Sequence, residues 1–214
     1  MHTQTLTNSS AGFSLVELMI AMAAGLVIIG AAYQSFTAQQ KIYAAQDRVT
    51  EMQQNARAGL DFMTRELRMA GYNPRGIPTT VQRMGIVAAS AHSIRFTRDM
   101  NGDGNTNGTD PCEDVTYALY DAGLDGDLDL GRSCGGGKNE PVAENITSLD
   151  FVYMWPDPTD PINKMIVTSN PDPNQLSQIR TIQITLTAQT ASKDPNRRTY
   201  RKITMVSSVR LRNF

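Results

Sequence analysis

The stretch GFSLVELMIAMAAGLVIIGAAY, residues 12–33, decides the fold, because it is long and apolar enough to cross a membrane as a helix. At helical rise, residues 13–33 cover about 31 Å, which matches the ~30 Å hydrocarbon core of a bilayer. Its single charge is Glu17. Because an acidic side chain at helix-centre depth costs roughly 2.5–3.5 kcal/mol, we expect Glu17 to have a function and a partner.

The small residues Ser9, Ser10, Ala11 and Gly12 lie before the apolar run. A cleavable secretory signal has its small-residue cleavage site after the apolar core, so this segment does not fit one. Anything removed is therefore the polar leader, residues 1–12, and the apolar segment stays on the mature protein. The leader has no Lys or Arg, so charge supports the membrane orientation only weakly, through the N-terminal amine and His2. A signal anchor that keeps its leader is the alternative.

The order Gly-Phe-Ser-Leu-Val-Glu-Leu-Met-Ile, residues 12–20, resembles the class III signal of type IV pilins and pseudopilins. The resemblance implies cleavage between Gly12 and Phe13 by a membrane prepilin peptidase, and then N-methylation of Phe13. It also implies that Glu17 faces the N-terminal ammonium of a neighbouring subunit during assembly. A buried carboxylate is tolerated when it is paired with a cation, so the physical argument agrees.

Helical periodicity continues beyond the membrane-length run. Apolar residues recur at steps of seven, then three or four, up to a predicted helix end near Ala70, where Gly71 suits a C-cap and Pro74 prevents continuation. We expect a solvated face between them that includes Arg57, Glu66 and Arg68. A folded domain or a second helix of a coiled-coil dimer would cover the apolar stripe. Its members are Ile42, Val49, Met52, Ala56, Leu60, Met63, Leu67 and Ala70.

The rest of the chain predicts short strands separated by Gly, Pro, Asn and Asp. Within one of them Ile182, Ile184 and Leu186 alternate with Gln183, Thr185 and Thr187, so one face should pack on the helical stripe. We therefore predict an α+β fold, a long N-terminal helix on an antiparallel sheet, as in pilins. The strands are expected at 84–88, 93–98, 115–120, 146–154, 164–168, 179–188 and 200–211. The expected parts are the leader 1–12, the transmembrane and assembly half of the helix 13–36, its amphipathic half 37–71, and a β-rich domain 72–214 with an Asp- and Gly-rich insert 99–138.

The two cysteines, Cys112 and Cys134, flank a Gly- and Asp-rich segment. In a domain outside the cytoplasmic membrane we expect them to form a disulfide that contributes about 3 kcal/mol of unfolded-state entropy. Two free thiols are the alternative. Only His2 and His92 are present and no CxxC pair occurs, so we do not expect zinc.

The segment from Asp99 to Asp110 fits the start of a calcium loop, with oxygen donors at positions one, three and five and Gly104 at position six. Position twelve is Asp instead of the usual Glu. A solvated Asn-Gly turn is the alternative, since these residues also dominate turns for local reasons. The calcium ligands expected are Asp99, Asn101, Asp103, Asn105, Asn107 and Asp110.

The C-terminal part is basic: from Leu176 onward Asp194 is the single acid among eight basic side chains. Such a face binds phosphates or an acidic neighbour, or it protects an edge strand from unwanted pairing. We do not expect nucleic acid, because such basic residues more often occupy alternating solvent-side positions of a strand and a hairpin turn, here residues 192–196. No nucleophile motif or phosphate-binding Gly loop is visible, so we do not expect an enzyme. The basic residues are Arg180, Lys193, Arg197, Arg198, Arg201, Lys202, Arg210 and Arg212.

The helix-end segments 53–57 and 60–72 and the closing segment 208–213 are similar to PilW-type minor pilins. The resemblance implies a minor subunit of a type IV pilus that primes assembly and joins a tip complex. The implied partners are other minor pilins, the major pilin, a tip adhesin, the prepilin peptidase and the inner membrane, with the β domain periplasmic or extracellular. The alternative is a J-type minor pseudopilin of type II secretion.

Overall fold

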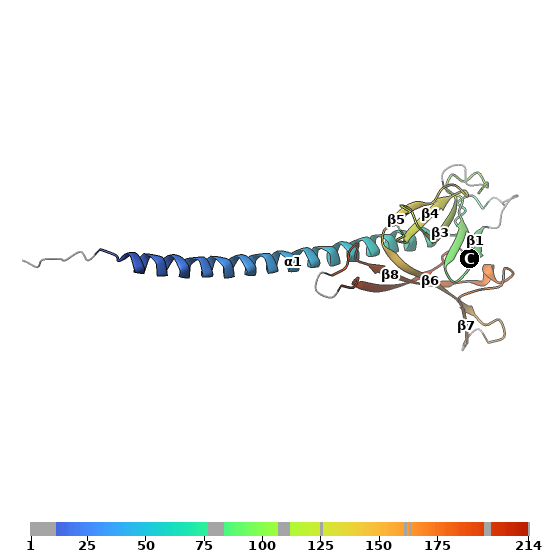
Figure 1. The fold of residues 1–214 in the computed structure, drawn as a ribbon. Helices are drawn as coiled ribbons and strands as arrows, with labels where there is room; N and C mark the ends of the chain where they lie inside the picture. The colour runs from blue at the N-terminus through green and yellow to red at the C-terminus, as the bar shows by residue number, and fades with distance from the viewer. Residues whose placement is uncertain are drawn as a thin grey trace, which may run out of the picture. The chain divides into compact units, whose positions relative to one another are not determined.

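The chain begins with one long helix, α1, which spans Leu15–Leu67 (Figure 1). This computed structural model describes residues 12–76, 84–106, 112–124, 126–160, 162, 164–194 and 198–213. The chain divides into two compact units, Met1–Gln46 and Asp47–Phe214, so α1 contributes its first part to one unit and its last part to the other. The second unit contains all the described strands.

The helix ends at Leu67, three residues before the predicted end at Ala70. The amides of Met69 and Ala70 bond to carbonyls three residues back, which tightens the last turn before the chain leaves the helix. Gly71 follows with φ of 76° and donates its amide to the Thr97 carbonyl at 2.9 Å. A left-handed glycine is the usual helix terminator, so the predicted role of Gly71 is confirmed.

One sheet has five antiparallel strands in the order β1-β2-β3-β4-β5. Its strands are β1 Gly85–Ala89, β2 Ser93–Thr97, β3 Asp114–Tyr120, β4 Asp129–Cys134 and β5 Glu140–Ala143.

The strands β4 and β5 lie outside the strand segments predicted from the sequence. Each contains a residue that is rare in strands, Gly131 in β4 and Pro141 in β5. The proline is tolerated because β5 is an edge strand. At Gly131 a Cβ would collide with the Tyr120 ring, so the glycine is needed for the close pairing of β3 and β4.

The second sheet has four antiparallel strands in the order β7-β6-β8-β9. Its strands are β6 Ile146–Pro156, β7 Met165–Thr168, β8 Thr181–Gln189 and β9 Lys202–Arg210, and a short 3-10 helix, η1 Leu176–Gln178, precedes β8. In β8 the side chains of Ile182, Ile184 and Leu186 are fully buried, whereas the residues between them are partly exposed. The predicted alternation is confirmed.

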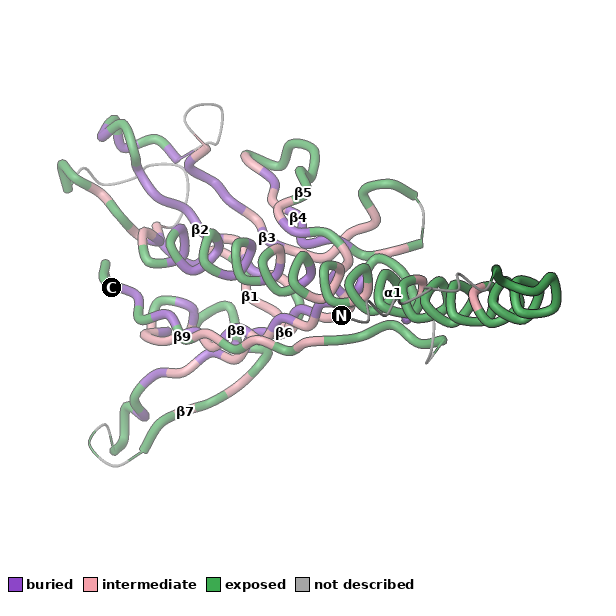
Figure 2. The backbone as a smooth tube through the Cα atoms, turned by 90° about the vertical axis from the view of Figure 1, so that its left-hand side faces the viewer, coloured by how far each residue is buried: buried purple, intermediate pink, exposed green. Residues whose placement is uncertain are grey.

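The apolar stripe of α1 and both sheets form one hydrophobic core in the unit that begins at Asp47. Figure 2 shows the buried residues on the strands and on the last turns of α1. The helix lies close to β5 at Gly59, where a Cβ would lie 2.7 Å from the Ala143 Cβ. Of the predicted stripe, Ile42 alone is exposed and Val49 is half-buried. The α+β prediction, a long N-terminal helix on antiparallel sheet, is confirmed.

Candidate functional site

The peptide bond expected to be cleaved lies before the helix begins. Gly12 and Phe13 have no regular secondary structure, and the Phe13 side chain is 90% exposed. Residues 1–11 of the leader lie outside the described part of the chain. An exposed bond without helical hydrogen bonds is accessible to a peptidase, so the geometry is compatible with the expected cleavage.

Glu17 lies in the first turn of α1 and forms a capping box with Ser14. The Ser14 amide and hydroxyl both donate to Glu17 Oε2 at 3.2 Å, and the Glu17 amide donates to Ser14 Oγ at 3.2 Å. Among the described residues no Lys, Arg or His pairs with this carboxylate. The signal for this cap was in the sequence, a Ser followed three residues later by Glu before an apolar run. The cap satisfies amides at the helix start, and no described residue supplies a counter-charge to Glu17.

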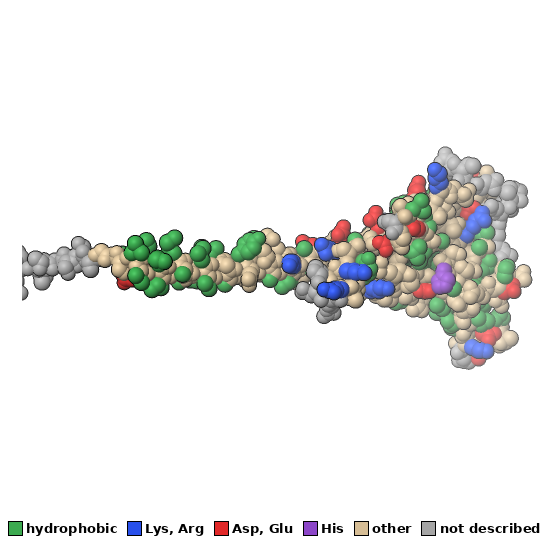
Figure 3. Space-filling view, viewed as in Figure 1, with side chains coloured by type: hydrophobic (Ala, Val, Ile, Leu, Met, Phe, Trp, Pro, Cys, Tyr) green, Lys and Arg blue, Asp and Glu red, His purple; other side chains and the backbone are tan. Residues whose placement is uncertain are grey.

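The first half of α1 exposes apolar side chains on all its faces, as Figure 3 shows for one view. It contains a helical window with mean hydropathy 2.3 that is long and apolar enough to span a membrane, and none of that window is buried within the protein. Lipid or other helices must cover such a surface in the cell. Its large exposed side chains are Leu15, Val16, Leu18, Met19, Ile20, Met22, Leu26, Val27, Ile28, Ile29, Tyr33 and Phe36.

Glu66, at the other end of α1, is buried, so the expectation that it lies on a solvated face is wrong. Its Oε1 accepts hydrogen bonds from Arg98 Nη2 at 2.8 Å and Arg132 Nη2 at 2.9 Å. Its Oε2 accepts from Arg132 Nε at 2.8 Å and from the Tyr117 hydroxyl at 2.6 Å. The signal for burial was the step of seven from Met52 to Gly59 to Glu66 along the stripe.

This Glu66 network fixes the charge states of its members. Burial alone would raise the pKa of Glu66, but the hydrogen bonds from Arg132, Tyr117 and Arg98 lower it below its ordinary value. Burial and the adjacent Glu66 charge raise the pKa of Tyr117. The Glu66 carboxylate is therefore ionised, and it holds the end of α1 to the five-stranded sheet.

The predicted disulfide between Cys112 and Cys134 is present, with Cα atoms 5.1 Å apart. Arg132 donates from Nη1 to Cys134 Sγ and from Nη2 to Cys112 Sγ, each at 2.9 Å. The same guanidinium lies 5.7 Å from the centre of the Phe62 ring on α1. The disulfide and the Glu66 network therefore share one arginine.

The acidic loop begins after β2 and is organised by its own carboxylates. The buried Asp99 accepts the Gly102 amide at 2.6 Å and the Gly104 amide at 3.0 Å. Both glycines have positive φ, which the backbone needs to turn around the carboxylate. Asn101 and Asp103 bond to each other, and the Asn105 amide donates to Asp103 Oδ1 at 2.7 Å. Asn107 and Asp110 lie outside the described residues.

A third carboxylate joins this loop from a position the sequence pattern does not predict. Oxygens of Asp99, Asp103 and Glu113 all lie within 4.8 Å of one another. Glu113 is buried, and its Oε1 accepts the amides of Met100 at 2.7 Å and Asn101 at 3.2 Å. Carboxylate oxygens suit a hard cation such as calcium. In the sequence, Glu113 stands just after the twelve-residue loop pattern and next to Cys112, and this position is the signal that could have identified it.

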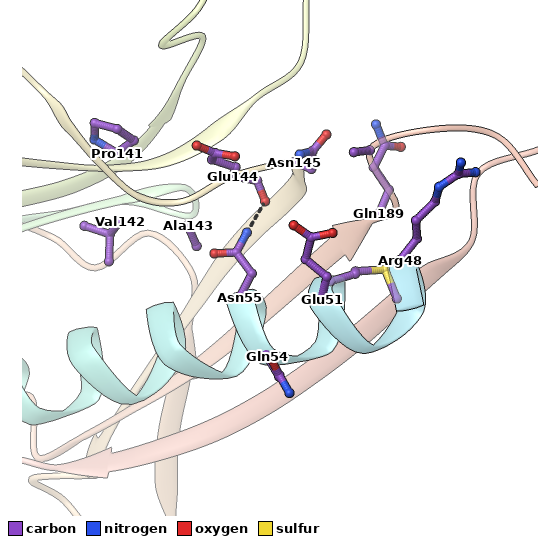
Figure 4. Close-up of a pocket in the computed structure, with 12 residues that line it drawn as sticks. Arg48, Glu51, Gln54, Asn55, Pro141, Val142, Ala143, Glu144, Asn145 and Gln189 are labelled. Atoms are coloured by element: carbon purple, nitrogen blue, oxygen red, sulfur yellow. Dashed lines mark hydrogen bonds between the residues drawn. The ribbon is translucent and has the colours of Figure 1, made fainter. Parts of the chain in front are cut away.

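A polar hollow of about 440 Å³ lies between α1, the turn from β5 to β6 and the end of β8 (Figure 4). Asn55 on α1 lines the hollow and donates from Nδ2 to the Glu144 carbonyl at 3.0 Å. Arg48 and Glu51 on α1 face Asn145 and Gln189 across it. These are amide and charged groups, and the described lining residues include no Ser, Thr, Cys or His that could serve as a nucleophile paired with a base.

Comparison with known families gives two matches. The family described as prepilin peptidase-dependent protein B matches residues 45–210. The chain belongs to this family. The prokaryotic N-terminal methylation motif matches residues 7–33, which include Gly12, Phe13 and Glu17. This member of the prepilin peptidase-dependent protein B family is thus type IV pilin-like, with a signal and an apolar helix suited to membrane anchoring.

Among solved structures, a type IV-like pilin from Thermus thermophilus is similar, with 13% identity and a TM-score of 0.37. The similarity covers 79% of this chain and 97% of that one. No curated protein matches the chain.

Proposed function

We propose that this prepilin peptidase-dependent protein is a minor pilin that helps to prime assembly of a type IV pilus and joins its tip complex. The observation that carries the proposal is Glu17, a carboxylate without a described counter-charge at the start of an exposed apolar helix. Cleavage after Gly12 would create an ammonium at Phe13, and a neighbouring subunit could present that ammonium to Glu17.

Assembly in this way requires partners of three kinds. The prepilin peptidase would cut between Gly12 and Phe13, and Phe13 would be N-methylated. The apolar half of α1 would be held in the bacterial inner membrane before assembly and against other pilin helices afterwards. The domain from Asp47 onward would then contact other minor pilins, the major pilin and a tip adhesin, as a structural subunit without catalysis.

The decisive experiment is recovery of the chain from sheared cell-surface pili. We expect a mature N-terminus of N-methylated Phe13 by mass spectrometry, an amount far below that of the major pilin, and loss of piliation when the gene is deleted. Recovery in stoichiometric amount would contradict a minor role. Normal piliation with failure of protein secretion on deletion would instead favour a J-type minor pseudopilin.

We also propose that the acidic loop binds calcium through Asp99, Asp103 and Glu113, with Asn101 and Asn105 alongside. Three carboxylate oxygens within 4.8 Å of one another support this, because without a cation they repel. Calorimetry on the full chain in neutral detergent should show saturable calcium binding and a higher Tm. The variant Asp103→Asn should weaken both effects, whereas Asp121→Asn outside the loop should not. Equal Tm with calcium and with a chelator would contradict the proposal.

A further inference from the structure

Four arginines surround a second hollow, of about 720 Å³, at the last residues of β9. They come from three places in the chain: Arg68 follows α1, Arg180 precedes β8, and Arg210 and Arg212 lie at the C-terminal end. Ser208 and Leu211 complete the lining. Among the residues that the structure describes, the lining therefore contains four cations and no carboxylate.

The fold holds these arginines in place through neighbouring backbone and side-chain bonds. Thr181 and Arg210 are paired between β8 and β9, and the Leu211 amide donates to the Arg180 carbonyl at 2.9 Å. Asn213 Nδ2 donates to the Ala70 carbonyl at 3.1 Å, which ties the C-terminal segment to the residues after α1. Val209 and Leu211 are buried, so the alternation of the chain turns Arg210 and Arg212 outward. The hollow is thus part of the folded domain.

None of the four guanidiniums makes an ion pair within the part of the chain that the structure describes. Arg180 donates from Nη1 to the carbonyls of Ser177 at 2.8 Å and Ile179 at 3.1 Å, which orients it without neutralising it. By contrast, Arg201, the residue before β9, is paired with Asp194 at 2.9 Å. Four unneutralised like charges around one hollow repel, and an anionic group placed among them removes that repulsion.

The choice of anion follows from the rest of the chain. Guanidiniums bind carboxylates and phosphates through paired N–H groups, so both a protein and a nucleic acid have suitable groups. A duplex presents phosphates over a long surface, and its binding favours a strongly basic domain. This chain has a net charge of −1 and a pI of about 6.1, so it is not a strongly basic domain, and a short acidic protein segment fits the hollow better than a duplex does.

We propose that the hollow lined by Arg68, Arg180, Arg210 and Arg212 binds a short acidic segment of a partner protein through the carboxylates of that segment. The site lies in the unit that begins at Asp47, and the proposal does not depend on Glu17 docking. A failed binding test would therefore leave the proposed assembly function standing, and the reverse also holds.

The test is binding of a fluorescent poly-glutamate peptide to the full chain in neutral detergent at low salt. We expect saturable one-to-one binding that weakens as salt is raised, because exposed charges are screened. The variant with Arg210→Glu and Arg212→Glu should weaken binding by at least about tenfold. The matched control is Arg57→Glu with Lys138→Glu, two exposed residues outside the hollow that give the same net charge. It should bind nearly as the natural chain does.

A further pair of substitutions, Arg210→Lys with Arg212→Lys, keeps the charge and removes the paired donors, so it should weaken binding by a smaller factor. Unchanged Trp155 fluorescence and Tm in each variant would show that the fold is intact. The proposal is overturned if the natural chain does not bind the peptide, or if both charge-reversal variants bind equally. Tighter binding of a DNA duplex, or full displacement of the peptide by inorganic phosphate, would also overturn it.

Discussion

Glu17 and Glu66 lie near the two ends of the same helix, and their surroundings are opposite. The Glu17 carboxylate accepts hydrogen bonds from Ser14 alone among the described residues, within a surface of exposed apolar side chains. Glu66 is buried and accepts hydrogen bonds from two arginines and a tyrosine. One helix therefore carries a charge that is neutralised inside the chain, Glu66, and another, Glu17, that has no counter-charge among the described residues.

From this difference we expect Glu66 to act in the stability of the fold and Glu17 to act in subunit assembly. Removing Glu66 should damage the fold of the unit that begins at Asp47, because it leaves Arg98 and Arg132 without their partner. Removing Glu17 should leave that fold intact and impair docking. Trp155, the single tryptophan, is buried in the core, so its fluorescence reports unfolding of that unit in each variant.

The largest effect on stability is expected from Glu66→Gln. Breaking a buried ion pair by removing one partner costs about 3–5 kcal/mol, and we expect a loss in that range in the free energy of unfolding. Urea titration followed by Trp155 fluorescence measures it. The control Glu51→Gln changes an exposed glutamate of the same helix and should stay within about 0.5 kcal/mol of the natural chain. Equal stability of the two variants would contradict the conclusion that the Glu66 network stabilises the fold.

Loss of the disulfide should have the next largest effect. Replacing Cys112 and Cys134 by serine opens a bond between residues 22 apart in sequence, and we expect a loss of about 3 kcal/mol. The natural chain should show the same loss after reduction, and the double-serine variant should not respond to reductant. A natural chain that is insensitive to reductant would contradict this.

Two glycines of α1 extend the comparison to packing. At Gly59 a Cβ would lie 2.7 Å from Ala143 Cβ, whereas at Gly30 no atom lies within 4 Å. Overpacking costs about 1–3 kcal/mol, and alanine returns up to ~1 kcal/mol of helix propensity. We expect Gly59→Ala to destabilise the domain by about 1 kcal/mol in urea titration and Gly30→Ala to leave it unchanged. Equal values would show that α1 and β5 have room for a Cβ at Gly59.

The smallest effect is expected from mild acid. The pKa of Glu66 is lower in the folded chain than its ordinary 4.5. The ionised Glu66 therefore stabilises the folded state fully above pH 4.5, and this stabilisation is lost as the pH falls through the folded-state pKa. Urea midpoints measured below about pH 4.5 should therefore fall less steeply for Glu66→Gln than for the natural chain. Parallel curves would mean that the Glu66 pKa is not shifted.

Local patterns in the sequence predict the helix, the cap at Gly71 and the alternation in β8, since each depends on neighbours within a few residues. The Glu66 network could not be predicted in this way. Its partners Arg98, Tyr117 and Arg132 lie 32, 51 and 66 residues away, and only the folded sheet brings them together. The step of seven from Met52 to Glu66 indicates burial, which our expectation of a solvated face overlooked, and it does not indicate which groups neutralise Glu66.

The acidic loop, too, could be predicted from the sequence only in part. The residues Asp99 to Asn105 follow a local spacing rule, and the structure shows the turn that the rule implies. Glu113 joins them through the pairing of β2 with β3, which places Asp114 opposite Thr97. Spacing along the chain indicates the start of such a loop, but the position of its last carboxylate depends on the strands that close it.

The central claim is that Glu17 acts between subunits. The most direct measurement is the fraction of Glu17→Gln recovered in sheared pili, compared with the natural chain at equal amounts of processed subunit in the membrane. We predict that incorporation of Glu17→Gln is lost while its urea midpoint stays unchanged. Incorporation equal to that of the natural chain would contradict the claim.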